Sequence, residues 1–248
     1  RFHGLTGIPF GAAKACEMGL VDMLVGGEGA EDGDRAWQGL LRRLAQTAEA
    51  GGFVKARLSG IGNPKALGTV MGDWFAGRGA GAAAPPVSLD AASFSVLEVT
   101  HRGRGVYEVS MADHEARNTF SESMDRELAT VATALRGAGV RVVVLSSALA
   151  HFHVGVNPHH LRSWAKLPRT VIASKMKGLY NGFLALFSLP VPVIAVLSGK
   201  VYGGGVPLAL WCDYRVGTRD LDVHYGNITR GMSPAVQLSA LLGRYLTQ

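Results

Sequence analysis

The sequence predicts an α/β fold built around a largely parallel sheet. Two apolar, β-branched runs, VRVVVLSS over 140–147 and VPVIAVLSG over 191–199, are typical of strands that are buried on both faces. Helical patterns alternate with these strands, which is the order that produces parallel sheets. The 248 residues are 48% apolar and 18% charged, so the chain can form one large domain or two small ones.

Composition excludes several classes of protein. No run of eighteen apolar residues predicts a membrane span. The formal charge of +6 is spread along the chain, which disfavours nucleic-acid binding and favours a mild positive field toward an anionic ligand. Cys16 and Cys212 form no disulfide framework or metal motif and fit a reducing compartment. Because the chain begins at Arg1, we expect a processed product or an excised piece, whose targeting cannot be read.

The first 75 residues are predicted to be mostly helical. A short helix over AAKACEMG (12–19) closes at a glycine, and LVDMLV (20–25) follows as a short strand. Apolar residues at helical spacing predict another helix over 34–50. Residues 76–87 are a low-complexity Gly/Ala stretch with a proline pair, which is typical of a linker or a domain boundary.

Residues 88–248 alternate strands and helices. Strands over 94–101 and 105–111 are joined by a tight turn, and Ser121 caps the helix that follows. After the strand at 140–147 we expect a His-rich loop over 151–160 and an apolar helix over 175–188. The strand at 191–199 leads through a glycine turn into a last helix.

Two loops carry the chemistry. Gly203-Gly204-Gly205 and the loop over 151–160 each follow a buried strand, at the edge where open α/β sheets bind ligands. Glycines let the backbone approach a ligand, so two free N–H groups here would form an oxyanion hole. The four histidines of 151–160 lack accompanying Cys or carboxylate ligands, and we predict no metal site.

FHVGVNP (152–158) and PVIAVLSGKVYGGGVPLALWCDYRV (192–216) resemble the enoyl-CoA hydratase/isomerase (crotonase) superfamily. The resemblance implies a crotonase-like ββα superhelix core with a helical segment placed N-terminally. It also implies that the N–H groups of Val156 and Gly204 hold a thioester enolate oxygen, flanked by Gly155, Gly203 and Gly205. No cofactor is implied, because the substrate arrives as a thioester of CoA or of phosphopantetheine. Family members tend to form trimers or hexamers, so a homo-oligomer is expected, with no membrane or nucleic-acid partner.

The two glutamates that hydratases of this family use as acid and base are replaced. Pro207 stands at the first position and Asn227 at the second, and neither can carry a proton as a carboxylate does. MADHEARNTFSESM (111–124) resembles the crotonase-like enzymes of polyketide β-branching, which dehydrate or decarboxylate a thioester on an acyl carrier protein. Some of those enzymes have a counterpart of Asn227.

Decarboxylation needs an enolate sink and one proton donor. We predict His160 as that donor, with His159, His224 and Tyr225 as alternatives, and His159 and Tyr225 are also predicted to bind substrate. The preferred function is therefore an acyl-thioester lyase or isomerase of the polyketide type. Two alternatives stay open: an enoyl-CoA hydratase or isomerase of fatty-acid metabolism, and a catalytically silent scaffold domain of a multidomain synthase.

LTGIPFGAAKACEMGLVDMLV (5–25) resembles a segment that lies near the end of crotonase chains, with Lys14 where glutamate is usual. The order here is therefore tail, linker, core. Residues 1–75 are either the tail of a preceding repeat in a tandem array, which we favour, or a permuted part of the same fold. In both cases residues 88–248 correspond to a truncated N-terminal core.

Overall fold

The computed structural model of the chain describes residues 9–18, 20, 21, 23–25, 94–103, 105–136 and 139–226. The helix predicted over 34–50, the linker over 76–87 and Asn227 lie outside these residues.

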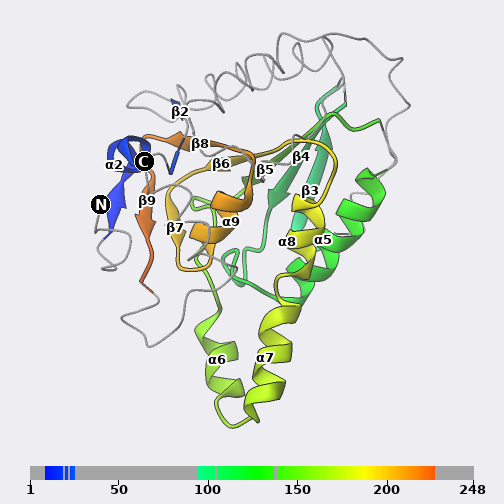
Figure 1. Cartoon of the computed structure of the whole chain (residues 1–248), viewed down its shortest axis with the longest axis vertical. Coiled ribbons are helices and arrows are strands. Elements are labelled where there is room, and N and C mark those ends of the chain that lie inside the picture. The colour runs from blue at the N-terminus through cyan, green and yellow to red at the C-terminus, as the bar shows by residue number, and fades with distance from the viewer. Residues whose placement is uncertain are drawn as a thin grey trace, which may run out of the picture.

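In the described part of the chain, six strands form the central sheet in the order β2-β8-β6-β5-β4-β3 (Figure 1). The strands are β2 (Met23–Val25), β3 (Leu97–His101), β4 (Val106–Met111), β5 (Val142–Ser147), β6 (Val193–Leu197) and β8 (Tyr214–Thr218). Every neighbouring pair is parallel except β3 and β4. The predicted α/β class with a largely parallel sheet is confirmed.

Two helices pack side by side next to β3 and β4: α5 (Glu122–Leu135) and α8 (Asn181–Phe187) (Figure 1). The predicted cap of α5 is confirmed, since the Ser121 hydroxyl accepts a hydrogen bond from the Met124 N–H at 3.1 Å. Gly182 allows the helices to approach closely, because a side chain there would overlap the backbone of Asp125. Its N–H donates to the Asp125 carboxylate at 2.6 Å.

A second sheet, of order β1-β9-β7, lies beside the first. It contains β1 (Phe10–Gly11), β9 (Asp222–His224) and β7 (Lys200–Tyr202). Strand β7 was not predicted from the sequence, because its three residues are too few to show a period. Strand β7 leads directly into the glycine turn and α9 (Gly205–Trp211), so it fixes where that turn lies.

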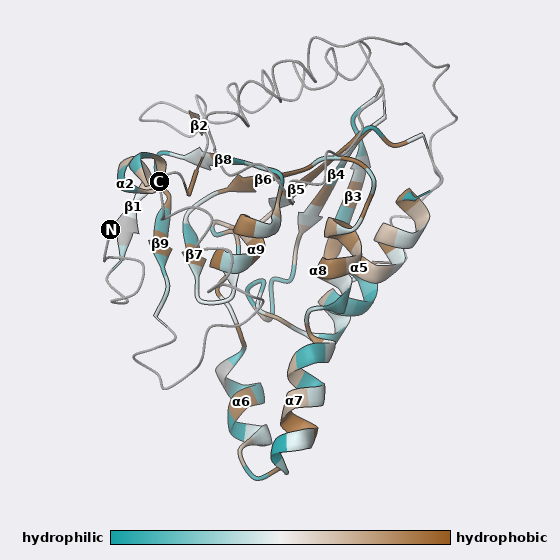
Figure 2. Ribbon diagram, viewed as in Figure 1, coloured by the Kyte–Doolittle hydropathy of each residue, from teal (hydrophilic) through white to brown (hydrophobic). Residues whose placement is uncertain are grey.

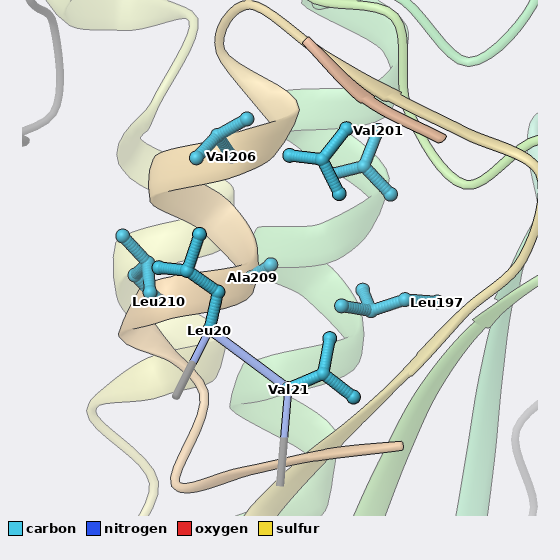
Figure 3. A pocket seen from close by; sticks show the side chains of 8 residues that line it. Leu20, Val21, Leu197, Val201, Val206, Ala209 and Leu210 are labelled. Atoms are coloured by element: carbon cyan, nitrogen blue, oxygen red, sulfur yellow. The ribbon is translucent and has the colours of Figure 1, made fainter. Parts of the chain in front are cut away.

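The N-terminal stretch packs on this core. Helix α2 (Ala12–Glu17) buries Ala15 completely. Leu20 and Val21 lie against α9 and Leu197 of β6, around an apolar cavity of about 10 Å³ (Figure 3). That volume holds one water molecule at most, so the cavity is a packing gap. Whether the stretch belongs to a preceding repeat or to a permuted domain stays a prediction.

Helices α6 (Pro158–Trp164) and α7 (Arg169–Gly178) form an arm that extends away from the sheet (Figure 1). Helix α7 buries none of its residues, and both helices carry hydrophilic stretches in Figure 2, whereas hydrophobic residues gather on α8 and α9.

Two local predictions were wrong in this region. The His-rich loop ends at Asn157, because its side chain caps α6 through the His159 N–H at 2.9 Å. His159 and His160 therefore lie on a helix. The single helix predicted over 175–188 is two helices, since the chain turns at Leu179 and Tyr180 to bury both side chains and direct α8 onto α5.

Candidate functional site

The loop after β5 and the turn after β7 meet at the edge of the sheet. The Tyr202 N–H donates to the His153 carbonyl at 2.9 Å, and His153 and Val201 form an isolated parallel bridge. The backbone of Gly155 lies against the glycine turn, because a Cβ on Gly155 would be 3.1 Å from the nitrogen of Gly204. The structure therefore brings together the two loops that the sequence analysis paired.

The peptide planes of both loops are fixed by their carbonyl groups. The Gly155 carbonyl accepts from the Phe120 N–H at 2.9 Å, and the Gly203 carbonyl accepts from the Val206 N–H at 3.2 Å. In a trans peptide the N–H points away from the C=O. The N–H groups of Val156 and Gly204 thus face away from these partners, and neither has an acceptor among the described residues.

The glycines at the site meet steric demands that other residues would not. Gly155 has a φ of +88° and Gly203 a φ of +53°, in the region that glycine adopts without strain. A side chain on Gly204 would overlap the ring of Phe120. On Gly205, a Cβ would lie 2.5 Å from the carbonyl oxygen of His153. The triple glycine therefore has two causes: Gly203 adopts a positive φ, and Gly204 and Gly205 lie too close to other residues to carry a side chain.

Side chains of an aromatic cluster lie behind the turn. The ring of Phe120 lies 4.4 Å from that of His153 and 4.7 Å from that of Tyr180, centroid to centroid. Burial raises the pKa of Tyr180 to about 12, and the nearby Tyr225 adds to the increase. The Tyr180 hydroxyl is buried without a hydrogen-bond partner in the described part of the chain. The sequence analysis missed Tyr180, because a tyrosine in an apolar helix has the pattern of a core residue.

His153 is the most buried histidine of the loop, with no exposed surface. Its Nδ1 accepts a hydrogen bond from the Gly155 N–H at 3.0 Å. Burial lowers the pKa of His153 to about 3, so the ring is neutral near pH 7. This residue was predicted only as one of four loop histidines, and no sequence signal separates it from its neighbours.

The DHEARNTFS stretch (113–121) has a structural task here. The Asn118 side chain accepts from the Asp113 N–H at 2.9 Å and donates to the Ser147 hydroxyl at 2.8 Å, which joins the ends of β4 and β5. Phe120 then reaches the glycine turn, and Ser121 caps α5. The stretch therefore holds the ends of β4 and β5 together and supports the glycine turn through Phe120.

The predicted proton donors lie in different surroundings. His160 stacks on Trp164 of the same helix, with ring centroids 5.7 Å apart, and its described contacts do not reach the glycine turn. His159 is exposed on α6. The His224 carbonyl accepts from the Gly203 N–H at 2.8 Å, which brings β9 to the turn, and Tyr225 is buried beside it.

Among the described residues, the acidic side chain of Asp222 accepts a hydrogen bond from the strand that leads into the turn. Pro207, at the first glutamate position, is buried in α9. Asp222 accepts from the Tyr202 hydroxyl at 2.5 Å, and this hydrogen bond raises the pKa of Tyr202 to about 12.

Among the described residues no group of three His, Cys, Asp or Glu side chains could hold a metal ion. In the same residues, no helix is long and apolar enough to cross a membrane.

The parallel-rich α/β sheet, with the loop after β5 lying against the glycine turn before α9, is the arrangement of a crotonase-type fold. The profile of the enoyl-CoA hydratase/isomerase family matches residues 101–247, more than half of the chain, so the chain belongs to this family.

Individual relatives agree with this. The chain is 29% identical over 153 residues to mouse enoyl-CoA hydratase domain-containing protein 2, mitochondrial, a match covering 61% of this chain and 51% of the relative. It is 32% identical over 138 residues to the fatty acid oxidation complex subunit alpha of Vibrio cholerae, covering 54% of this chain and 18% of that protein.

The structure is similar to the crystal structure of an enoyl-CoA hydratase from Polaromonas sp. JS666, with a TM-score of 0.58 and 26% identity. That match covers 62% of this chain and 60% of the other. The match with the mouse relative covers only about half of that protein's length.

Proposed function

We propose that the chain acts on acyl thioesters and stabilises their enolates between the N–H groups of Val156 and Gly204. The observation that carries this proposal is the pair of adjoining peptides whose carbonyls are engaged and whose N–H groups have no acceptor among the residues that the structure describes. Preorganised backbone donors are suited to the charge that develops on a thioester oxygen, because they need no reorganisation during the reaction.

The reaction we propose is that of a lyase or isomerase. Hydration needs a carboxylate that activates water, and Pro207 occupies the first of the two positions where relatives of this type are expected to carry one. Decarboxylation requires less. The bond to the leaving carboxylate breaks, its electron pair moves into the enolate held by the two N–H groups, CO₂ leaves, and a donor returns one proton to carbon. His224 and Tyr225, which adjoin the turn, and His160 are our candidates for that donor.

A basic arm beside the site supports an anionic carrier for the acyl group. Residues 158–178 of α6, α7 and their connection carry Arg162, Lys166, Arg169, Lys175 and Lys177, with no Asp or Glu. Coenzyme A and the phosphopantetheine arm of a carrier protein both bear phosphate, which such a surface attracts. We propose one of these carriers, and a β-branched substrate of the 3-methylglutaconyl type.

The test is incubation of the full chain with 3-methylglutaconyl thioester, carried in one reaction by CoA and in another by an acyl carrier protein. Mass spectrometry follows the loss of CO₂. We expect decarboxylation with at least one carrier, and Gly204→Pro, which deletes the donor N–H, to abolish it. Full activity of Gly204→Pro would contradict the proposed oxyanion hole.

Hydration of an enoyl-CoA is the second candidate, favoured by the names of the mouse relative and of the Polaromonas structure, and the name of the Vibrio cholerae relative adds fatty acid oxidation. Crotonyl-CoA, followed by the loss of its ultraviolet absorbance, tests it against a hydratase of the same family. Water addition at a comparable rate would replace our proposal. No turnover of any thioester, together with no thioester effect on thermal unfolding, would leave the scaffold hypothesis.

A further inference from the structure

The residue that connects the two proposed donor loops is His153. Its carbonyl accepts from the Tyr202 N–H, and Gly205 packs against the same carbonyl. Its side chain turns the other way along the loop and accepts from the Gly155 N–H at 3.0 Å. One residue therefore contacts the backbone on both sides of the site.

The conformation of Gly155 is held from both of its peptides. The N–H before its Cα donates to His153 Nδ1, and the carbonyl after its Cα accepts from Phe120. These two bonds fix the rotation of Gly155 at a φ of +88°, and that rotation sets the direction of the Val156 N–H. Without the imidazole acceptor, the peptide before Gly155 is free to turn, and glycine offers no steric resistance to such a turn.

The surroundings of His153 keep its Nδ1 available as an acceptor. A histidine accepts through one nitrogen only when the ring is neutral and the proton is on the other. The ring is fully buried between Phe120 and Phe183, with centroids at 4.4 and 5.8 Å. Its Nε2 has no hydrogen-bond partner among the described residues, so no neighbouring carboxylate draws a second proton onto the ring.

We infer that His153 is a positioning residue of the oxyanion hole: its Nδ1 holds the Val154–Gly155 peptide, and together with the Phe120 bond to the Gly155 carbonyl this fixes Gly155 so that the Val156 N–H faces the substrate oxygen. This inference rests on the proposed function, and His153 itself does not touch the substrate. A residue that only fills the core would affect stability, whereas a positioning residue affects the stabilisation of the enolate.

The experiment uses acetoacetyl-CoA, which ionises to an enolate with a strong ultraviolet absorbance, and butyryl-CoA, which does not. The pH at which bound acetoacetyl-CoA ionises reports on the oxyanion hole. His153→Phe keeps the aromatic packing and removes the acceptor, and we expect it to raise that pH by about one unit, a tenfold loss. Affinity for butyryl-CoA should change less than about twofold. His153→Asn, whose Oδ1 can replace Nδ1, should restore most of the loss, and His114→Phe, at an exposed histidine, should change nothing.

The outcomes separate this inference from the proposed function. If the wild-type chain binds an acetoacetyl thioester neither on CoA nor on an acyl carrier protein, both are overturned. If it binds and ionises acetoacetyl-CoA and His153→Phe does so at the same pH, only the role of His153 is overturned. Nitrogen NMR of ¹⁵N-histidine-labelled wild-type protein adds a measurement that needs no variant. We expect the His153 proton on Nε2 at pH 7, and a proton on Nδ1 would contradict the inference.

Discussion

Single atoms decide the geometry of the glycine turn. At Gly204 the missing Cβ leaves room for the Phe120 ring, and at Gly205 it leaves room for the His153 carbonyl. The site is therefore built from backbone that other backbone and one aromatic ring hold in place. Apart from a change to proline, a substitution does not remove these N–H donors, but added side-chain volume can displace them.

Gly204→Ala adds that volume. The methyl group meets the Phe120 ring, so we expect a loss of about 1–3 kcal/mol in the free energy of unfolding and a clear loss of thioester binding. Denaturant unfolding measures the first and calorimetric titration the second. Gly178→Ala is the matched control, because a Cβ there meets nothing within 4 Å, and it should be neutral or slightly stabilising. Equal effects of the two substitutions would contradict the packing described here.

The buried His153 makes stability depend on pH. Its pKa in the folded chain, about 3, lies below the ordinary value of 6.5, so the unfolded chain binds the extra proton first as the pH falls. The contribution of this ring is complete above pH 6.5 and is lost as the pH drops toward 3. The slope is about 1.4 kcal/mol per pH unit. Unfolding of wild type and His153→Phe, compared between pH 7 and pH 4, should show a flatter dependence in the variant. Parallel curves would mean that His153 takes up its proton at the same pH in the folded and the unfolded chain.

At the scale of elements, the sequence predicted those helices and strands that have a local signal, such as a run of β-branched residues or a capping side chain. The β-branched runs of β5 and β6 and the Ser121 cap of α5 are local signals, and all three are found in the structure. Strand β7 and the break between α7 and α8 were not predictable in this way. A three-residue strand has no period, and the break follows from the burial of Leu179 and of Tyr180, whose ring contacts the distant Phe120.

The candidate site residues divide in the same way, into those with a local sequence signal and those placed by contacts with distant residues. The glycines that carry the site are visible in the sequence, because GGG after a buried strand and before a helix is a local pattern. The separation of His153 from His159 and His160 depends on which side chain the loop turns inward, and that is decided by Phe120 and Phe183 from other elements. The role predicted for His160 stays a prediction.

Helix α2 offers a test of how the N-terminal stretch packs. Ala15 is completely buried and Ala13, in the same helix, is exposed. Ala15→Asp places a charge in the apolar contact with the core and should lower the free energy of unfolding by about 3 kcal/mol. Ala13→Asp should cost less than about 1 kcal/mol, since helix propensity alone changes. Similar thermal midpoints for the two variants would show that α2 does not pack on this core in solution.

At the scale of the whole molecule, the acidic residues are unevenly distributed along the chain, whereas the basic residues are spread through it. Residues 128–212 contain no Asp or Glu, and five of their basic residues lie on the arm of α6 and α7. The arm extends from the sheet directly after one of the two proposed donor loops, since α6 starts where that loop ends at Asn157 (Figure 1). An anionic carrier would therefore meet the arm while its acyl group enters the site.

Reversal of the arm's charge tests this arrangement. Lys166→Glu with Lys177→Glu should raise the KM for a CoA thioester about tenfold at low salt, with little change in kcat, and the difference should shrink as salt is added. Arg126→Glu serves as the control, because it also replaces an exposed positive charge with a negative one but lies on α5, outside the arm. An unchanged KM in the double variant would remove the arm from substrate binding.

The central claim is that two backbone N–H groups, of Val156 and Gly204, polarise the carbonyl of a bound thioester. Isotope-edited infrared spectroscopy of butyryl-CoA labelled with ¹³C at the thioester carbonyl measures this polarisation directly. With the ligand saturated by wild-type protein, the account predicts a carbonyl band at lower frequency than in water, and a return toward the free frequency with Gly204→Pro. A bound ligand whose carbonyl frequency is unchanged from that in water would contradict it.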